Sequence, residues 1–187
     1  MNNLPPVTKN LLIINVLFFF GAIVGRRYGV DLNDMLGLHF FLASDFKLFQ
    51  LVTYMFMHGD FQHIFFNMFA VWMFGRTLEL VWGPKRFLIY YMVCGIGAGL
   101  VQELVTGIEY YNLASSMPPE AVEAVLREGA SALQSGMNFV DSRMAELNLV
   151  VNHSTVGASG AVYGILLAFG MLFPNSQMFV FPIPFPI

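Results

Sequence analysis

Residues 61–80, FQHIFFNMFAVWMFGRTLEL, decide the fold class of this chain. They form an apolar run of about 20 residues, which is the length that crosses a bilayer as a helix. Three further apolar segments approach that length, at residues 10–25, 87–105 and 158–173. The sequence therefore predicts an all-α protein, a polytopic bundle of transmembrane helices.

The composition supports a membrane protein. Of 187 residues, 57% are hydrophobic and only 11% are charged, whereas soluble domains carry about 25% charged residues. The net charge of −3, with no basic block, lacks the electrostatic footprint of a nucleic-acid binder. We therefore expect the lipid bilayer as a partner and no nucleic acid. The single cysteine, Cys94, can form no intrachain disulfide.

The segments between the spans have distinct compositions within one domain, residues 1–187. Residues 26–58 mix charged and aromatic side chains, which favours an interfacial, partly embedded loop. Residues 109–152 hold six acids and two bases, and apolar residues from Val122 to Leu147 recur at helical spacing along one face. We expect an amphipathic, acidic insertion on the outer side that lies on the membrane or packs on its own bundle; a solvated spacer is the alternative. Residues 177–187 form an incomplete tail whose alternating prolines exclude a fifth span there.

A first candidate for chemistry is the pair His63 and Asn67. Their spacing stacks both side chains on one face of a helix. Two neutral nitrogen donors in a water-poor site are suited to stabilise a developing oxyanion. The alternative is a pair of polar residues that ties helices together. A metal site from His39, His58, Asp60 and His63 is a further alternative, but the spacing does not match a helical ligand pair, so we expect no metal.

A second candidate is Ser159, within Gly157-Ala-Ser159-Gly160 and one turn before Tyr163. Glycines on both sides let the backbone approach a reacting group closely, and the start of a helix favours negative charge. The alternative is an N-cap serine followed by small residues for helix packing. Gly95-Ile-Gly97-Ala-Gly99 lies within an apolar helix without a preceding strand, so it indicates close packing and no cofactor.

Together these motifs, with Glu79 after Gly75-Arg-Thr-Leu, resemble the rhomboid family of intramembrane serine proteases over residues 10–174. The resemblance implies a six-helix bundle, of which this chain has four spans, and transmembrane proteins as substrates. It assigns Ser159 as the nucleophile and His63 and Asn67 as oxyanion donors. Tyr163 matches the aromatic residue against which the catalytic histidine packs. Gly157, Gly160 and His58 match supporting positions. Basic residues at Lys9 and Lys85 place the N-terminus in the cytoplasm, and we expect a bacterial inner membrane protein.

One feature of the family is missing. Its general base is a histidine in an Ala-His-x-x-Gly motif, which this sequence lacks, and a serine needs a base to accept its proton. We expect the catalytic histidine to lie beyond the end of this chain, which would leave the chain alone inactive; His153 is a weaker candidate for the base.

The alternative functions are an inactive relative that binds transmembrane clients, and a small channel or transporter. The oligomeric state cannot be predicted.

Overall fold

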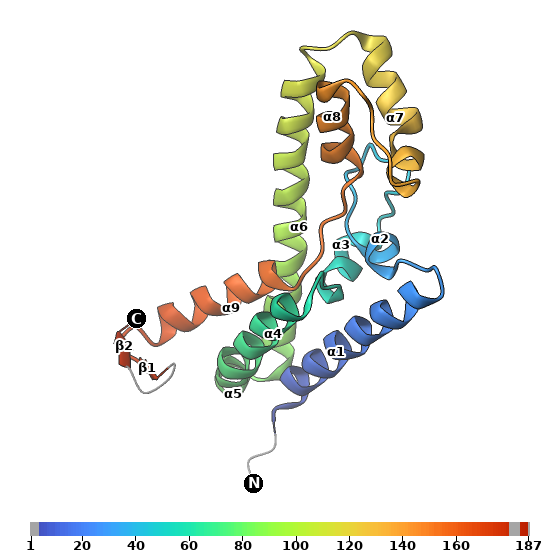
Figure 1. Cartoon of the computed structure of the whole chain (residues 1–187). Helices are drawn as coiled ribbons and strands as arrows, with labels where there is room; N and C mark the ends of the chain where they lie inside the picture. The colour runs from blue at the N-terminus through green and yellow to red at the C-terminus, as the bar shows by residue number, and fades with distance from the viewer. Residues whose placement is uncertain (1–3, 180–183, 187) are drawn as a thin grey trace.

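Three stretches of helix have the length and hydropathy to cross a membrane in the computed structural model, which describes residues 4–179 and 184–186. The first is α1 (Pro6–Arg27), and the third is α6 (Pro84–Ala114). Between them, α4 (Phe61–Ala70), a π-helical turn η2 (Val71–Gly75) and α5 (Arg76–Trp82) form one continuous stretch. The fourth apolar helix, α9 (Ser159–Leu172), is shorter. The predicted all-α membrane bundle is confirmed (Figure 1).

Two spans extend further than their apolar runs. The helix α1 begins at Pro6, where a proline fits the first turn because that N–H needs no partner. The helix α6 continues to Ala114, since no proline follows Pro84 until Pro118. At 31 residues it is about 46 Å long, well beyond a hydrocarbon core of about 30 Å. Its last turns therefore extend beyond the thickness of the hydrocarbon layer and lead into the insertion.

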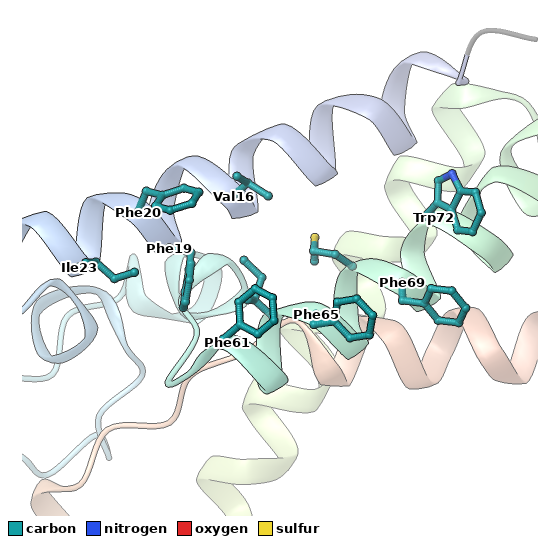
Figure 2. Close-up of a pocket in the computed structure, with 10 residues that line it drawn as sticks. Val16, Phe19, Phe20, Ile23, Phe61, Phe65, Phe69 and Trp72 are labelled. Atoms are coloured by element: carbon teal, nitrogen blue, oxygen red, sulfur yellow. The ribbon is translucent and has the colours of Figure 1, made fainter. Parts of the chain in front are cut away.

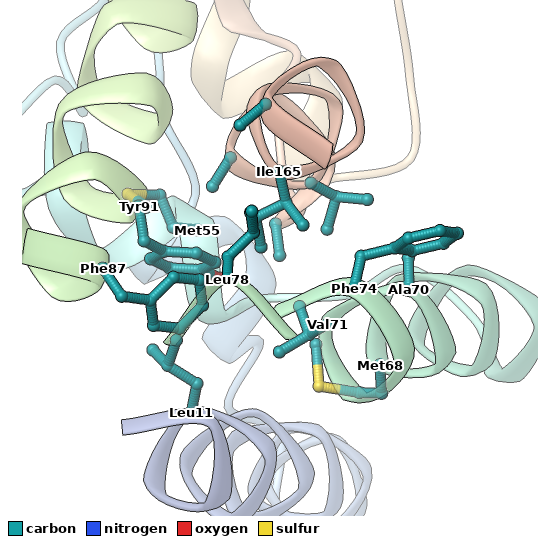
Figure 3. Close-up of a cluster of buried hydrophobic side chains, with 14 of the residues drawn as sticks. Leu11, Met55, Met68, Ala70, Val71, Phe74, Leu78, Phe87, Tyr91 and Ile165 are labelled. Carbon is teal, nitrogen blue, oxygen red and sulfur yellow. The ribbon is translucent and has the colours of Figure 1, made fainter. Parts of the chain in front are cut away.

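The main core lies where α1, α4–α5, α6 and α9 meet (Figure 3). Phe87 and Tyr91 of α6 are fully buried, and so is Ile165 of α9. Leu11 of α1 and Val71 of η2 complete the contact between the helices. This core fixes the start of α9 relative to α4, which is the arrangement that the candidate site needs.

A buried carboxylate joins α1 to α5. Glu79 is 2% exposed and accepts hydrogen bonds from the backbone N–H groups of Val7 and Thr8 at 2.9 and 2.7 Å. The Thr8 hydroxyl donates a third bond at 2.8 Å. Glu79 thus satisfies free N–H groups in the first turn of α1 and places a negative charge where the helix dipole favours it.

Residues 26–58 fold against the bundle. They contain α2 (Leu32–Leu36), α3 (Gln50–Thr53) and the 3₁₀ turn η1 (Tyr54–Phe56). The buried Gln50 organises this segment: its Oε1 accepts from the N–H groups of His39 and Lys47, and its Nε2 donates to the carbonyls of Met35 and Asp45. The loop is therefore internally fixed; its depth in a membrane stays a prediction.

The insertion consists of two helices, α7 (Pro119–Gln134) and α8 (Ser142–Asn152), beside the far end of α6 (Figure 1). Val125, Leu147 and Val151 form a second core with Phe40 and Ala43 of the first loop. The insertion therefore packs on its own chain, and the solvated-spacer alternative is wrong. The expected single apolar face is also wrong, because Gly136 turns the chain at φ 71° and leaves Met137 and Val140 exposed.

The tail contains no helix in the part that the structure describes. Strand β1 (Gln177–Phe179) pairs antiparallel with β2 (Pro184–Pro186). Pro182 lies outside the described residues.

Candidate active site

His63 and Asn67 lie on one face of α4, as their spacing predicts. Asp60 caps this helix, since its Oδ1 accepts the N–H of His63 at 2.8 Å. Asn67 is 6% exposed, and its Nδ2 has no hydrogen-bond partner among the described residues. A buried amide donor without a partner costs stability, so this group is available to an acceptor that enters the site.

Ser159 is the first residue of α9. Ala158 occupies the capping position, and no side chain caps the helix. The alternative in which Ser159 serves as an N-cap is therefore wrong. The first N–H groups of a helix have no intrahelical partner and carry a positive partial charge. Ser159 thus presents its hydroxyl beside free backbone donors.

Gly157 brings the two motifs together. Its φ of 131° disfavours any residue with a side chain. A Cβ built at this position would lie 2.6 Å from Nε2 of His63 and 3.6 Å from Oγ of Ser159. The imidazole and the hydroxyl, which are 96 positions apart in sequence, therefore face the same small space. Glycine is required here both by the backbone and by the imidazole.

Two contacts that the sequence does not predict hold the Gly157 segment in place. The carbonyl of Tyr54 accepts the N–H of Gly157 at 2.9 Å. Leu38 and Thr155 exchange two backbone hydrogen bonds, each 2.8 Å long. The Tyr54 hydroxyl donates to the carbonyl of Gly95 at 2.6 Å and so ties the arrangement to α6. Nothing in the sequence distinguishes Tyr54 from the other six tyrosines.

Small residues let α9 approach α6. A Cβ at Gly160 would collide with Ala98, and one at Gly164 would collide with Cys94. The Tyr90 hydroxyl donates to the Gly164 carbonyl at 2.8 Å. The small residues after Ser159 thus pack α9 against α6, as the alternative interpretation expected, and the supporting role of Gly160 in a catalytic site stays a prediction.

His58 supports His63 from the loop before α4. Its side chain is 1% exposed, and its ring packs edge-on against that of His63 at a centroid distance of 5.0 Å. Burial, followed by the neighbouring His63, lowers the pKa of His58 to about 4. Neither ring nitrogen has a partner among the described residues. His58 is therefore a neutral packing partner of His63.

Tyr163 follows Ser159 by one helical turn but is 72% exposed. It lies on α9 without a place in either core of the described residues. Its role against a catalytic histidine stays a prediction.

The structure brings together a set of possible metal ligands that differs from the predicted one. Asp34, His39 and Asp45 are the one group with ligand atoms at metal-binding spacing among the described residues. Gln50 Nε2 lies 3.3 Å from Nδ1 of His39, and Nε2 of His39 lies 3.2 Å from Oδ1 of Asp34. This group shares only His39 with the set that the sequence offered as an alternative metal site.

No histidine or carboxylate hydrogen-bonds to the Ser159 hydroxyl among residues 4–179 and 184–186. His153 is exposed and lines a cavity of about 770 Å³ with Asp31 and Asp34. Ser159 does not line that cavity, so the structure offers no support for His153 as its base.

Fold and site together define a polytopic helical membrane protein in which a serine between glycines faces a histidine, and a buried amide donor lies one turn along the helix of that histidine. A family model described as the Rhomboid domain matches residues 45–187. The chain belongs to the rhomboid family.

Curated relatives include rhomboid proteins from bacteria, fungi and plants. The chain is 28% identical over 131 residues to "Rhomboid protein 1, mitochondrial" of Saccharomyces cerevisiae, covering 69% of this chain and 27% of the relative. It is 24% identical over 110 residues to "Rhomboid protease GlpG" of Haemophilus influenzae, covering 58% and 55%. It is 27% identical over 182 residues to "RHOMBOID-like protein 12, mitochondrial" of Arabidopsis thaliana, covering 96% and 46%. The chain thus spans between about a quarter and just over half of these relatives.

Proposed function

We propose that this chain carries the nucleophile and the oxyanion donors of an intramembrane serine endopeptidase that cleaves transmembrane proteins. Membership of a family with a relative named as a protease supports the reaction class. The observation that carries the proposal is the junction at Gly157, where the His63 imidazole and the Ser159 hydroxyl face one space.

The proposed chemistry uses these groups in sequence. Ser159 Oγ attacks the scissile carbonyl and loses its proton to a general base, and the carbonyl oxygen becomes an oxyanion. His63, the Asn67 amide and the Ser159 backbone N–H donate to that oxyanion. The base then protonates the leaving amine, and water releases the acyl group by the reverse steps. The unpartnered Nδ2 of Asn67 supports its assignment, because the donor is already desolvated and needs no rearrangement.

The general base is proposed for the whole protein. The family resemblance implies a histidine in an Ala-His-x-x-Gly motif, and the relatives are longer than this chain. Tyr163, exposed on α9 one turn after Ser159, supports a histidine packed on that face. We further propose a cytoplasmic N-terminus, which the basic residues Lys9 and Lys85 favour, and the bacterial inner membrane as location.

The deciding experiment is active-site labelling of the complete gene product in native membranes. A fluorophosphonate probe should label the protein, and Ser159→Ala should abolish both labelling and cleavage of a transmembrane substrate. Ser131→Ala, a change on the exposed surface of α7, is the matched control and should retain both. Cleavage that survives Ser159→Ala would refute the assignment.

A second candidate function is that of an inactive relative that binds transmembrane clients, because no base contacts Ser159 among the described residues. This function predicts a complete gene product without the Ala-His-x-x-Gly motif, no probe labelling, and client binding that Ser159→Ala leaves unchanged.

A further inference from the structure

An apolar groove runs between α1 and α4 on the outside of the bundle. Phe20 and Ile23 of α1 face Phe65 and Phe69 of α4 across it, and Trp72 of η2 lies at one end (Figure 2). The groove encloses about 620 Å³, and every residue that lines it is apolar. Both walls belong to stretches that have the length and hydropathy to span a membrane. The groove therefore opens toward hydrocarbon, and the proposed protease chemistry does not use it.

A basic residue stands at the other end of this groove. Val16, Phe20 and Ile23 line the α1 wall, and Arg27 continues the same helical face one turn past Ile23. Arg27 is exposed and is the last residue of α1. It forms no ion pair within the part of the chain that the structure describes, whereas its neighbour Arg26 lies 3.7 Å from Asp31. Among the described residues, Arg27 is thus a cation without an anionic partner, one helical turn past the end of an apolar groove.

We propose that the groove binds an acyl chain of an anionic phospholipid, whose phosphate pairs with Arg27. The walls supply only apolar contacts, which suit a hydrocarbon chain, and the helix end supplies a cation, which suits a phosphate. A transmembrane peptide helix would match the apolar walls but would leave Arg27 without an anion. The combination of groove and cation on one face of α1 therefore favours a lipid.

The position of this lipid relates it to the candidate active site. Phe65 and Phe69 line the groove from α4. His63 and Asn67, each two residues earlier, lie nearly on the opposite face of the same helix, because two residues turn an α-helix by about 200°. A bound acyl chain would therefore pack against the face of α4 that is turned away from His63 and Asn67, and would help to fix the position of this helix.

The test uses Trp72 as a reporter in the full chain. Trp82 is the other tryptophan and is removed by Trp82→Phe. The protein is reconstituted in phosphatidylcholine vesicles, and mid-chain brominated phosphatidylglycerol or brominated phosphatidylcholine is titrated in. Bromine quenches tryptophan on contact, so the two quenching curves give the relative affinity of the groove for each headgroup.

We expect brominated phosphatidylglycerol to quench Trp72 at the lower mole fraction. Arg27→Gln should reduce this preference about fivefold, which corresponds to about 1 kcal/mol per basic residue at the membrane surface. Arg27→Lys should retain it, and Lys9→Gln at the opposite end of α1 should not change it. Equal quenching by the two lipids, or an unchanged preference in Arg27→Gln, would overturn the proposal. So would a transmembrane peptide helix that shields Trp72 from both brominated lipids, since the groove would then bind protein.

Discussion

Glu79 caps the helix that contains Thr8, across 71 positions of sequence and between two spans of the bundle. One carboxylate accepts three hydrogen bonds from the start of α1 and is almost completely buried. The contact holds α1 against α5 and so helps to fix the groove and the α4 face that bears the candidate site.

Glu79→Gln should lower the free energy of unfolding by about 2–4 kcal/mol, because the charge-assisted bonds weaken and an amide N–H₂ faces backbone donors. Titration with a denaturing detergent, followed by circular dichroism, measures this loss. The control is Glu123→Gln, since Glu123 is exposed and lies 3.9 Å from Arg127 across a solvent-screened ion pair; it should leave the stability essentially unchanged. Equal losses in both variants would show that the cap contributes little.

Gly157→Ala should displace the His63 imidazole and strain the backbone. The strain at positive φ costs about 1–3 kcal/mol, and the new methyl would lie 2.6 Å from Nε2 of His63. We expect loss of fluorophosphonate labelling in the complete gene product, with secondary structure retained. Gly97→Ala is a suitable control, because nothing lies within 4 Å of a Cβ at that position. Normal labelling of Gly157→Ala would contradict the proposed geometry.

Asn67→Ala should separate catalysis from stability. Removing an oxyanion donor lowers turnover by about 10-fold or more. Stability should not fall by the cost of a lost hydrogen bond, because Nδ2 has no partner among the described residues in the folded chain. Parallel measurements of cleavage rate and unfolding test this split. A stable variant with an unchanged rate would return Asn67 to a packing role.

His58 should make the fold sensitive to acid. Its pKa is lowered to about 4 in the folded protein, against about 6.5 when unfolded. The unfolded chain therefore binds a proton at a higher pH, and His58 lowers stability progressively as the pH falls from about 6.5 to 4. The loss at full protonation is roughly 3 kcal/mol.

His58→Phe keeps an aromatic ring against His63 and removes the titrating group. It should flatten the dependence of stability on pH between about 4 and 6.5 without lowering stability at neutral pH, since neither His58 nitrogen has a partner in the described structure. Unfolding curves recorded across this pH range compare the variant with the unaltered chain. An identical acid slope in both would assign the sensitivity to another group.

The sequence by itself determined the class of the fold and the identity of the candidate groups. Long apolar runs can only satisfy their backbone groups in a membrane as helices, so the spans were predictable from hydropathy. Helical geometry places His63 and Asn67 on one face of a helix, and it does the same for Ser159 and Tyr163, because each pair is separated by four residues.

Only the tertiary structure decided how these groups meet. The contact of His63 with Gly157 depends on Tyr54 and Leu38, which hold the Gly157 segment by backbone hydrogen bonds that no side-chain pattern encodes. The sequence does not determine whether the apolar residues of the insertion face lipid, water or protein. In the structure they pack against Phe40 and Ala43 of the first loop. The groove beside Arg27 likewise forms only where two helices meet. The sequence of each wall alone is that of an ordinary lipid-facing helix surface, so it does not predict a groove. Periodicity reports which face of an element is apolar, but long-range packing selects what that face contacts.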